Sequence, residues 1–175
     1  RQRQMCIRDS LSIFTVATLG SELVSSRIER NTGSELYREA NLIAADYLPG
    51  FFTEALSAAD VQMQLNGMRT HLDADIWFTD ASGEMLRSSQ RKSSDVRPLS
   101  VEDFNPAEAG SSQYLLGDYH GYFPEDMLTV IAPVTEGFVT RGYLLIHKPY
   151  EDLVQMQHHI MKIMYIAVSY THLRA

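Results

Sequence analysis

Hydrophobic residues recur every three or four positions in two stretches of the first half of the chain. The spacing predicts a long helix over residues 21–48. Pro49 ends or kinks this helix, because proline lacks the backbone N–H that a helix needs. Its apolar stripe comprises Leu36, Ala40, Ile43 and Tyr47. A second helix is predicted over residues 58–72, where Ser57 and Asp60 form a capping-box pattern at the start.

After residue 73 the apolar positions alternate with a period of two, as they do in strands. Residues 74–80 and 84–88 are predicted to form a hairpin. In its first strand, Trp77 lies on the face opposite to Ile76 and Phe78. The hairpin is followed by a polar loop over 90–98, a helical or irregular excursion over 101–109, and three further strands over 113–116, 127–134 and 138–148.

Pro149 ends the last predicted strand, and residues 150–168 are predicted to form a terminal exit helix. The apolar stripe of this helix comprises Leu153, Met156, Ile160 and Ile163. Helices therefore precede and follow an antiparallel sheet, which is an α+β arrangement.

Composition narrows the function classes. The chain has 175 residues, of which 45% are hydrophobic, so one domain with one core is expected. The formal net charge of −7 argues against nucleic-acid binding, because neutralising phosphates needs a basic face. A single cysteine rules out a disulfide framework and any multi-cysteine metal site.

The two ends of the chain need separate treatment. Residues 1–10 and 169–175 resemble peptides translated from sequencing-adaptor DNA at the edges of metagenomic contigs, and we interpret them as non-native. The adjoining apolar segments 11–20 and 160–168 are each too short to cross a bilayer of roughly 30 Å. We interpret them as the remnant of a first transmembrane helix and the start of a second; buried helix ends are the alternative.

Four segments of the chain carry a resemblance to a known family: Glu35–Ala45, Leu72–Gly83, Gly121–Val134 and Gly142–Pro149. They resemble the extracytoplasmic sensor domains of histidine kinases from anaerobic low-GC Gram-positive bacteria. The resemblance implies a PAS-like, single-Cache domain over residues 21–159, with an antiparallel sheet, a long N-terminal helix and a C-terminal exit helix. It also implies a location outside the cytoplasm, between two transmembrane helices of the cell membrane.

The function implied by this resemblance is ligand sensing for a two-component sensor histidine kinase. Such a receptor is a homodimer that acts on a cognate response regulator, and its kinase half, which is absent from this chain, uses ATP and Mg²⁺. No cofactor is expected for the chain itself. The same module on a chemoreceptor or a cyclic-dinucleotide enzyme remains an alternative, as does a soluble small-molecule-binding or hydrolase-like domain.

Candidate ligand-binding residues come from strand parity and from aromatic content. Alternation places Arg141, Tyr143 and His147 on one face of the last strand, where charge, ring and imidazole could bind a polar small molecule. The segment that would cover this face contributes Tyr119, His120 and Tyr122. The alternative is that the tyrosines only pack, with their hydroxyls in water.

Other kinds of site receive little support from the sequence. Acidic residues cluster over 102–126, so divalent cations that bridge them or a cationic peptide are further conceivable stimuli. The histidines lack metal-ligand spacing, and neither a phosphate-binding glycine loop nor a serine-hydrolase motif occurs. We therefore expect no metal site and no catalytic residue in this chain.

Overall fold

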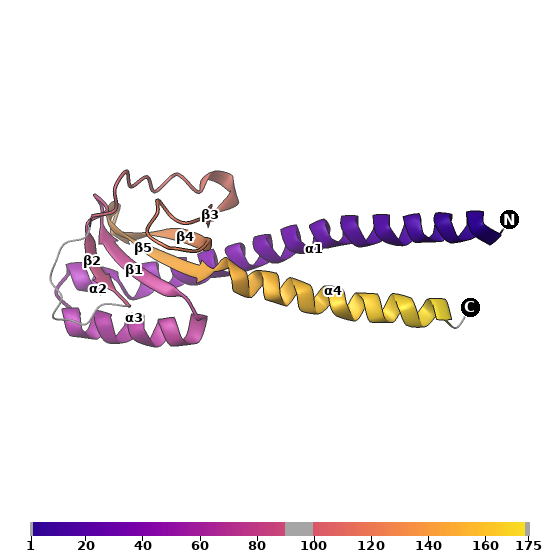
Figure 1. The fold of residues 1–175 in the computed structure, drawn as a ribbon. Coiled ribbons are helices and arrows are strands. Elements are labelled where there is room, and N and C mark those ends of the chain that lie inside the picture. The colour runs from indigo at the N-terminus through magenta and orange to yellow at the C-terminus, as the bar shows by residue number, and fades with distance from the viewer. Residues whose placement is uncertain (1, 90–99, 174–175) are drawn as a thin grey trace. The chain divides into compact units, whose positions relative to one another are not determined.

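The computed structural model describes the backbone of residues 2–89 and 100–173, and the side chains of residues 20–89, 100–163 and 166 (Figure 1). The chain divides into two compact units, one formed by Arg1–Asn31 with Glu151–Ala175 and the other by Thr32–Tyr150. The predicted loop over 90–98 lies outside the described residues. The two units are described separately below.

The unit Thr32–Tyr150 contains one five-stranded antiparallel sheet in the order β2-β1-β5-β4-β3. The strands are β1 (Asp75–Asp80), β2 (Met85–Ser88), β3 (Leu115–Gly117), β4 (Met127–Glu136) and β5 (Val139–Pro149). The predicted α+β class is confirmed, and every predicted strand is present with small shifts at its ends.

One face of this sheet, which we call the helix face, is covered by α2 (Pro49–Phe52) and α3 (Ala58–Leu72) (Figure 1). Phe78 of β1 lies between the rings of Phe51 and Phe52, with centroid distances of 5.5 and 5.7 Å. Edge-to-face pairs of this kind add to the stabilisation from buried area. The helix face is therefore an apolar core.

The start of α3 is fixed by the capping box expected from the sequence. The backbone N–H of Asp60 donates to Ser57 Oγ at 3.2 Å, and the Ser57 N–H donates to Asp60 Oδ2 at 3.0 Å. The hydrogen bond from the Ser57 side chain, with a further one from its backbone, lowers the pKa of Asp60. These bonds fix the first residue of the helix, and its predicted range of 58–72 is confirmed.

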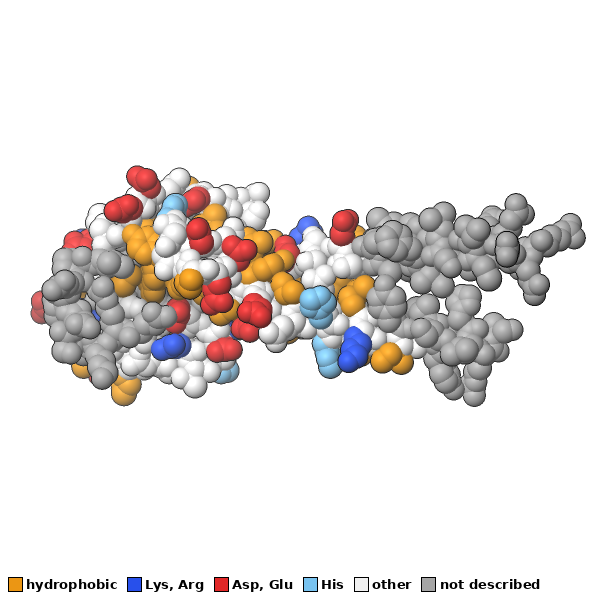
Figure 2. All heavy atoms as spheres, viewed as in Figure 1, with side chains coloured by type: hydrophobic (Ala, Val, Ile, Leu, Met, Phe, Trp, Pro, Cys, Tyr) orange, Lys and Arg blue, Asp and Glu red, His pale blue; other side chains and the backbone are white. Residues whose placement is uncertain are grey.

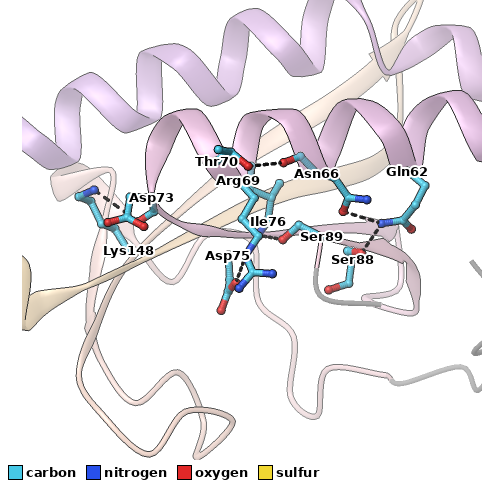
Figure 3. Close-up of polar contacts among 10 residues, drawn as sticks. All are labelled: Gln62, Asn66, Arg69, Thr70, Asp73, Asp75, Ile76, Ser88, Ser89 and Lys148. Atoms are coloured by element: carbon cyan, nitrogen blue, oxygen red, sulfur yellow. Dashed lines mark hydrogen bonds and ion pairs between the residues drawn. The ribbon is translucent and has the colours of Figure 1, made fainter. Parts of the chain in front are cut away.

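Polar contacts then attach α3 to the sheet (Figure 3). Gln62 Nε2 donates to the carbonyl of Ser88 at 2.7 Å, and Arg69 pairs with Asp75 at 3.4 Å. At the end of the helix, Lys148 Nζ of β5 donates to the Leu72 carbonyl at 2.8 Å. A cation at this position donates a hydrogen bond to a terminal carbonyl of the helix, and its charge interacts favourably with the negative C-terminal end of the helix dipole.

The other face of the sheet, which we call the loop face, is covered by residues of the described segments 100–114 and 118–126 (Figure 1). The only helical residues in these described segments are the short 3₁₀ helix η1 (Gly110–Ser112). The predicted excursion over 101–109 consists of turns, one of the two forms expected. The loop face therefore has an irregular cover where the helix face has a regular one.

The first helix, α1 (Gln2–Asp46), is longer than predicted and runs through both units. Its buried positions in the sheet unit are Gly33, Leu36, Ala40 and Ala44, followed by Leu48 beyond its end. The predicted stripe is confirmed at Leu36 and Ala40, whereas Ile43 and Tyr47 are only half-buried. The buried positions are spaced first by three residues and then by four.

The last helix, α4 (Tyr150–Leu173), belongs almost entirely to the unit formed by the two chain ends. Within that unit, Gln157 Nε2 donates to the carbonyl and the hydroxyl of Ser21 at 3.3 and 3.2 Å. Leu153 is buried as predicted, whereas Met156 and Ile163 are 55% and 57% exposed. Across the described residues, no helix combines the length and the apolar character needed to cross a membrane.

Candidate functional site

The loop face carries an aromatic cluster centred on Trp77. The Trp77 ring centroid lies 4.4 Å from that of His147 and 5.4 Å from that of Phe123. Tyr122 and Tyr119 approach Trp77 at 5.6 and 6.0 Å. Strands β1 and β5 supply Trp77 and His147, and the segment before β4 supplies the other three. These five residues are called the aromatic cluster below.

His147 is fully buried inside this cluster. Its Nδ1 lies 2.8 Å from Thr129 Oγ1 on β4, and its Nε2 has no hydrogen-bond partner. Burial lowers the pKa of His147 to about 3, so the imidazole is neutral at neutral pH. An unpaired imidazole nitrogen can form one hydrogen bond with a group that enters the cluster.

The contact between Thr129 and His147 also bears on the hydrolase-like alternative. A hydroxyl beside an imidazole is the arrangement of a nucleophile and its general base. Such a base needs a third group that orients its second nitrogen, and Nε2 of His147 lacks one. The described residues thus show a hydroxyl–imidazole pair without the third member of a triad.

Tyr143 extends the loop face, and Tyr122 of the aromatic cluster holds its cover. The Tyr143 ring lies 5.2 Å from the ring of Phe104. The Tyr122 hydroxyl donates to the Ser100 carbonyl at 2.9 Å and accepts from the Glu102 N–H at 3.1 Å. These bonds attach the segment that follows residue 99 to the aromatic cluster.

A cavity of about 280 Å³ opens beside the cluster, lined by β3, the turn that follows it, Glu108 and Thr129. Burial, with a smaller contribution from Glu108, raises the pKa of Tyr119, so its hydroxyl stays protonated. His120 Nε2 lies 3.1 Å from Glu108 Oε2. Tyr119 and His120 both adopt left-handed backbone conformations, with φ of 46° and 58°, and such strain is common at ligand-binding segments.

A second cavity, also about 280 Å³, lies between α1, the end of α3 and the end of β5. Glu35 and Glu39 line it from α1, and His71 and Lys148 line it from the other two elements. No group of three or more potential metal ligands in the described part of the chain could hold a metal ion. Acidic side chains predominate over Lys and Arg on the face shown in Figure 2.

The predicted site residues separate into two groups. Tyr119, Tyr122, Tyr143 and His147 gather on the loop face, and His120 borders the first cavity. Arg141 pairs with Glu136 at 2.9 Å, with 52% of its side chain exposed, and it lines neither of the two cavities described here, so its part in ligand binding stays a prediction. A shift in the β4–β5 register between Val134 and Thr135 breaks the alternation near this end of the strands. Strand parity alone could not place Arg141 for that reason.

The sequence reasoning missed Trp77, Phe123 and Thr129 as members of this region. A usable signal existed for Trp77, since its parity in β1 is opposite to that of the apolar core residues beside it. Trp77 also lies opposite Leu145 in the antiparallel register, on the face that carries His147. Thr129 is opposite His147 in the β4–β5 ladder, a pairing that only the register reveals.

Comparison with solved structures finds the same fold in bacterial sensor domains. The extracellular domain of vpHK1S-Z8, described as a histidine kinase, matches with a TM-score of 0.59 at 14% identity, over 83% of this chain and 63% of that one. The sensor domain of the V. cholerae histidine kinase DctB matches with a TM-score of 0.54 at 15% identity, over 89% and 60%. This chain thus spans about three fifths of each structure.

These matches place the chain in a fold class. Its long N-terminal helix, five-stranded antiparallel sheet and C-terminal helix have the fold of these two sensor domains, so the fold expected from the sequence resemblance is confirmed. No protein-family model matches the chain, and a search of curated proteins gave no match either. The fold likeness is therefore structural, at low sequence identity.

Proposed function

We propose that this chain is the ligand-sensing, extracytoplasmic module of a membrane-bound two-component sensor histidine kinase. The observation that carries the proposal is the fold it shares with the sensor domains of vpHK1S-Z8 and DctB. In this proposal residues 11–20 and 160–168 belong to two transmembrane helices of the cell membrane, and the receptor is a homodimer. A kinase half beyond this chain binds ATP and Mg²⁺ and phosphorylates a cognate response regulator.

The loop face is the proposed stimulus site. Its neutral His147 supplies one free hydrogen-bonding nitrogen, and the cluster rings supply apolar surface. The neighbouring cavity adds the Tyr119 hydroxyl and the His120–Glu108 pair. A few polar groups set in an apolar surround are typical of small-molecule sites. We therefore favour a small molecule over a peptide as the stimulus.

The junction of β5 with α4 is the proposed output. Pro149 still pairs with Met127 in the sheet, and Tyr150, the next residue, begins α4. The Tyr150 N–H donates to the Asp126 carbonyl at 2.9 Å, and proline fixes its own φ. With no linker residue between strand and helix, a shift of β5 passes to α4 with little slack. The available coupling is the ligand's differential affinity, typically about 1–3 kcal/mol.

An insertion tests this output path. The chain is fused through α4 to the membrane span and kinase core of a characterised receptor, and small molecules are screened for an effect on autophosphorylation. Two glycines inserted between Pro149 and Tyr150 should abolish the response while leaving basal activity intact. The same insertion between Gly137 and Phe138, at an exposed hairpin tip, is the control and should leave the response unchanged. A full response in the junction variant contradicts the proposal.

A reporter fusion tests the location. The hairpin tip at Phe138 is fully exposed, so it accepts an insertion. The turn at Gly83 is unsuitable, because a Cβ there would lie 2.6 Å from the Phe104 side chain. With native flanking sequence restored, a reporter that is active only outside the cytoplasm should give signal at the tip. Signal from a cytoplasm-specific reporter would contradict an extracytoplasmic sensor.

A further inference from the structure

Gly33 lies buried in α1, where glycine is unfavourable for a helix and therefore needs a reason. A Cβ at this position would lie 2.5 Å from Cδ1 and 2.8 Å from Cγ of Tyr114. The Tyr114 ring thus lies directly against the backbone of the helix. Only a residue without a side chain permits so close an approach.

The atoms that make this contact belong to the near end of the tyrosine ring. Because Cγ is bonded to the Cβ of Tyr114, the ring cannot give way there by a small rotation of its far end. Relative movement of Tyr114 and α1 therefore needs either a rotation about the Cα–Cβ bond of Tyr114 or a shift of the backbone of residue 114. That backbone leads directly into β3, whose first residue is Leu115.

Strand β3 forms a wall of the first cavity, which all three of its residues line. It is an edge strand with only three paired positions, all on β4. A strand held by so short a ladder is easier to displace than β4 or β5, which pair over ten positions. A molecule in the cavity would thus displace β3 first.

The part of α1 beyond Gly33 also has room to respond. Glu35, Leu36 and Glu39, together with Thr32 just before Gly33, line the second cavity, so this side of the helix borders open space near the end of α3 although Leu36 itself is buried. Dense packing holds the elements of a protein interior in discrete arrangements. An open space beside a helix relaxes this packing constraint locally, so the helix can shift there.

From these observations we infer that Tyr114 and Gly33 form the positioning contact that couples the edge strand of the first cavity to α1. The inference rests on the proposed sensing function and deepens it, because it gives the sensor a second output through its N-terminal helix. A ligand in the cavity moves β3, and Tyr114, the residue before β3, moves with it. The Tyr114 ring then shifts its position against α1 at Gly33. Neither residue needs to touch the ligand.

A double-mutant cycle in the full chain tests the contact. Gly33→Ala should lower the melting temperature by roughly 4 °C or more, because the new methyl group overpacks against Tyr114. In a Tyr114→Ala background the same change should instead raise it by roughly 2 °C, as expected for Gly→Ala in a helix. Gly67→Ala in α3, where no atom lies within 4 Å, is the matched control and should be stabilising in both backgrounds.

A covalent probe tests the coupling without a known ligand. In a Cys6→Ser background, Leu116→Cys places one thiol at the cavity, and benzyl methanethiosulfonate fills the space next to it. Hydrogen exchange of the α1 amides over residues 32–40 should change roughly fivefold or more on labelling. The response should persist in Tyr114→Phe and vanish in Tyr114→Ala. Met63→Cys, at an exposed position of α3, is the control; labelled with the same reagent, it should produce no change in exchange.

The outcomes separate this inference from the proposed function. Equal exchange in labelled Tyr114→Ala and labelled parent chains would overturn the coupling, whether or not a stimulus has been found. A Gly33→Ala chain as stable as Gly67→Ala would overturn the contact itself. If both tests succeed while no small molecule alters kinase output, the coupling holds and the histidine-kinase proposal fails.

Discussion

The two faces of the same sheet are built in different ways. On the helix face, Phe78, Leu144 and Ile146 are fully buried, apolar, and covered by regular helices. On the loop face, Leu145 alternates with a buried histidine and a tyrosine under an irregular segment. Regular helices fix one arrangement of their contacts, whereas a loop held by rings and a few hydrogen bonds can rearrange. Stability is thus concentrated on one face and capacity for change on the other.

The largest expected effect tests the helix face. Phe78→Ala removes a buried ring that contacts two others, and it should reduce the free energy of unfolding by about 3–5 kcal/mol. Urea denaturation followed by circular dichroism measures this loss. Phe138→Ala, at a fully exposed position, serves as the control and should change stability by no more than about 0.5 kcal/mol. A loss at Phe78 near the control value would mean that the helix face is not the stable core.

Two neighbouring leucines compare the faces directly. Leu144 and Leu145 are consecutive, both have no solvent exposure, and they point to opposite faces of β5. Leu→Ala costs about 2–5 kcal/mol, depending on how far the surroundings collapse into the cavity. We expect Leu144→Ala near the top of this range and Leu145→Ala near the bottom, because the loop can settle onto the smaller side chain. Equal losses would contradict the distinction between the faces.

The pH dependence of stability sharpens the contrast. His147 binds a proton near pH 3 in the folded chain and near pH 6.5 when unfolded, so the unfolded state binds more protons between these values. Stability should therefore fall by about 1.4 kcal/mol for each pH unit below roughly 6.5. In His147→Asn, which retains a partner for Thr129, this slope should be absent. An unchanged slope between pH 6.5 and 5 would mean that another group is responsible.

The smallest effect is expected at Arg141. Its ion pair with Glu136 is half-exposed, and such pairs contribute about 0–1 kcal/mol. Arg141→Ala and Glu136→Gln should each have a free energy of unfolding close to that of the parent chain. Their melting temperatures, measured with each small molecule of a screen, should also match those of the parent chain. A specific loss of ligand response in Arg141→Ala alone would restore this residue to the binding site.

The elements were predictable where local chemistry determines them. The capping box at Ser57 fixed the start of α3, and period-two alternation correctly separated Trp77 from Ile76 and Phe78. The aromatic residues that gather on the loop face could be suspected from their types. Their mutual contacts could not, because they depend on the strand register and on the path of an irregular segment.

What stayed hidden involves residues distant in sequence. The contact between Gly33 and Tyr114 joins positions some 80 residues apart, and nothing local to either residue indicates the other. A glycine inside a strongly predicted helix was the one available clue. The position of Arg141 relative to the loop face was hidden for a similar reason, since the register shift near Val134 is invisible to a count of alternating positions.

The order of strands has a consequence for how this protein behaves in concentrated solution. The longest and most apolar strands, β4 and β5, lie in the interior of the sheet, and the edges are the four-residue β2 and the three-residue β3. Unpaired edges are the places where one molecule can add its strand to another. Edges this short offer a poor template for a second molecule. Strand β3 covers only Met127, Leu128 and Thr129 of β4, so displacing β3 would open these three positions to pairing with another chain.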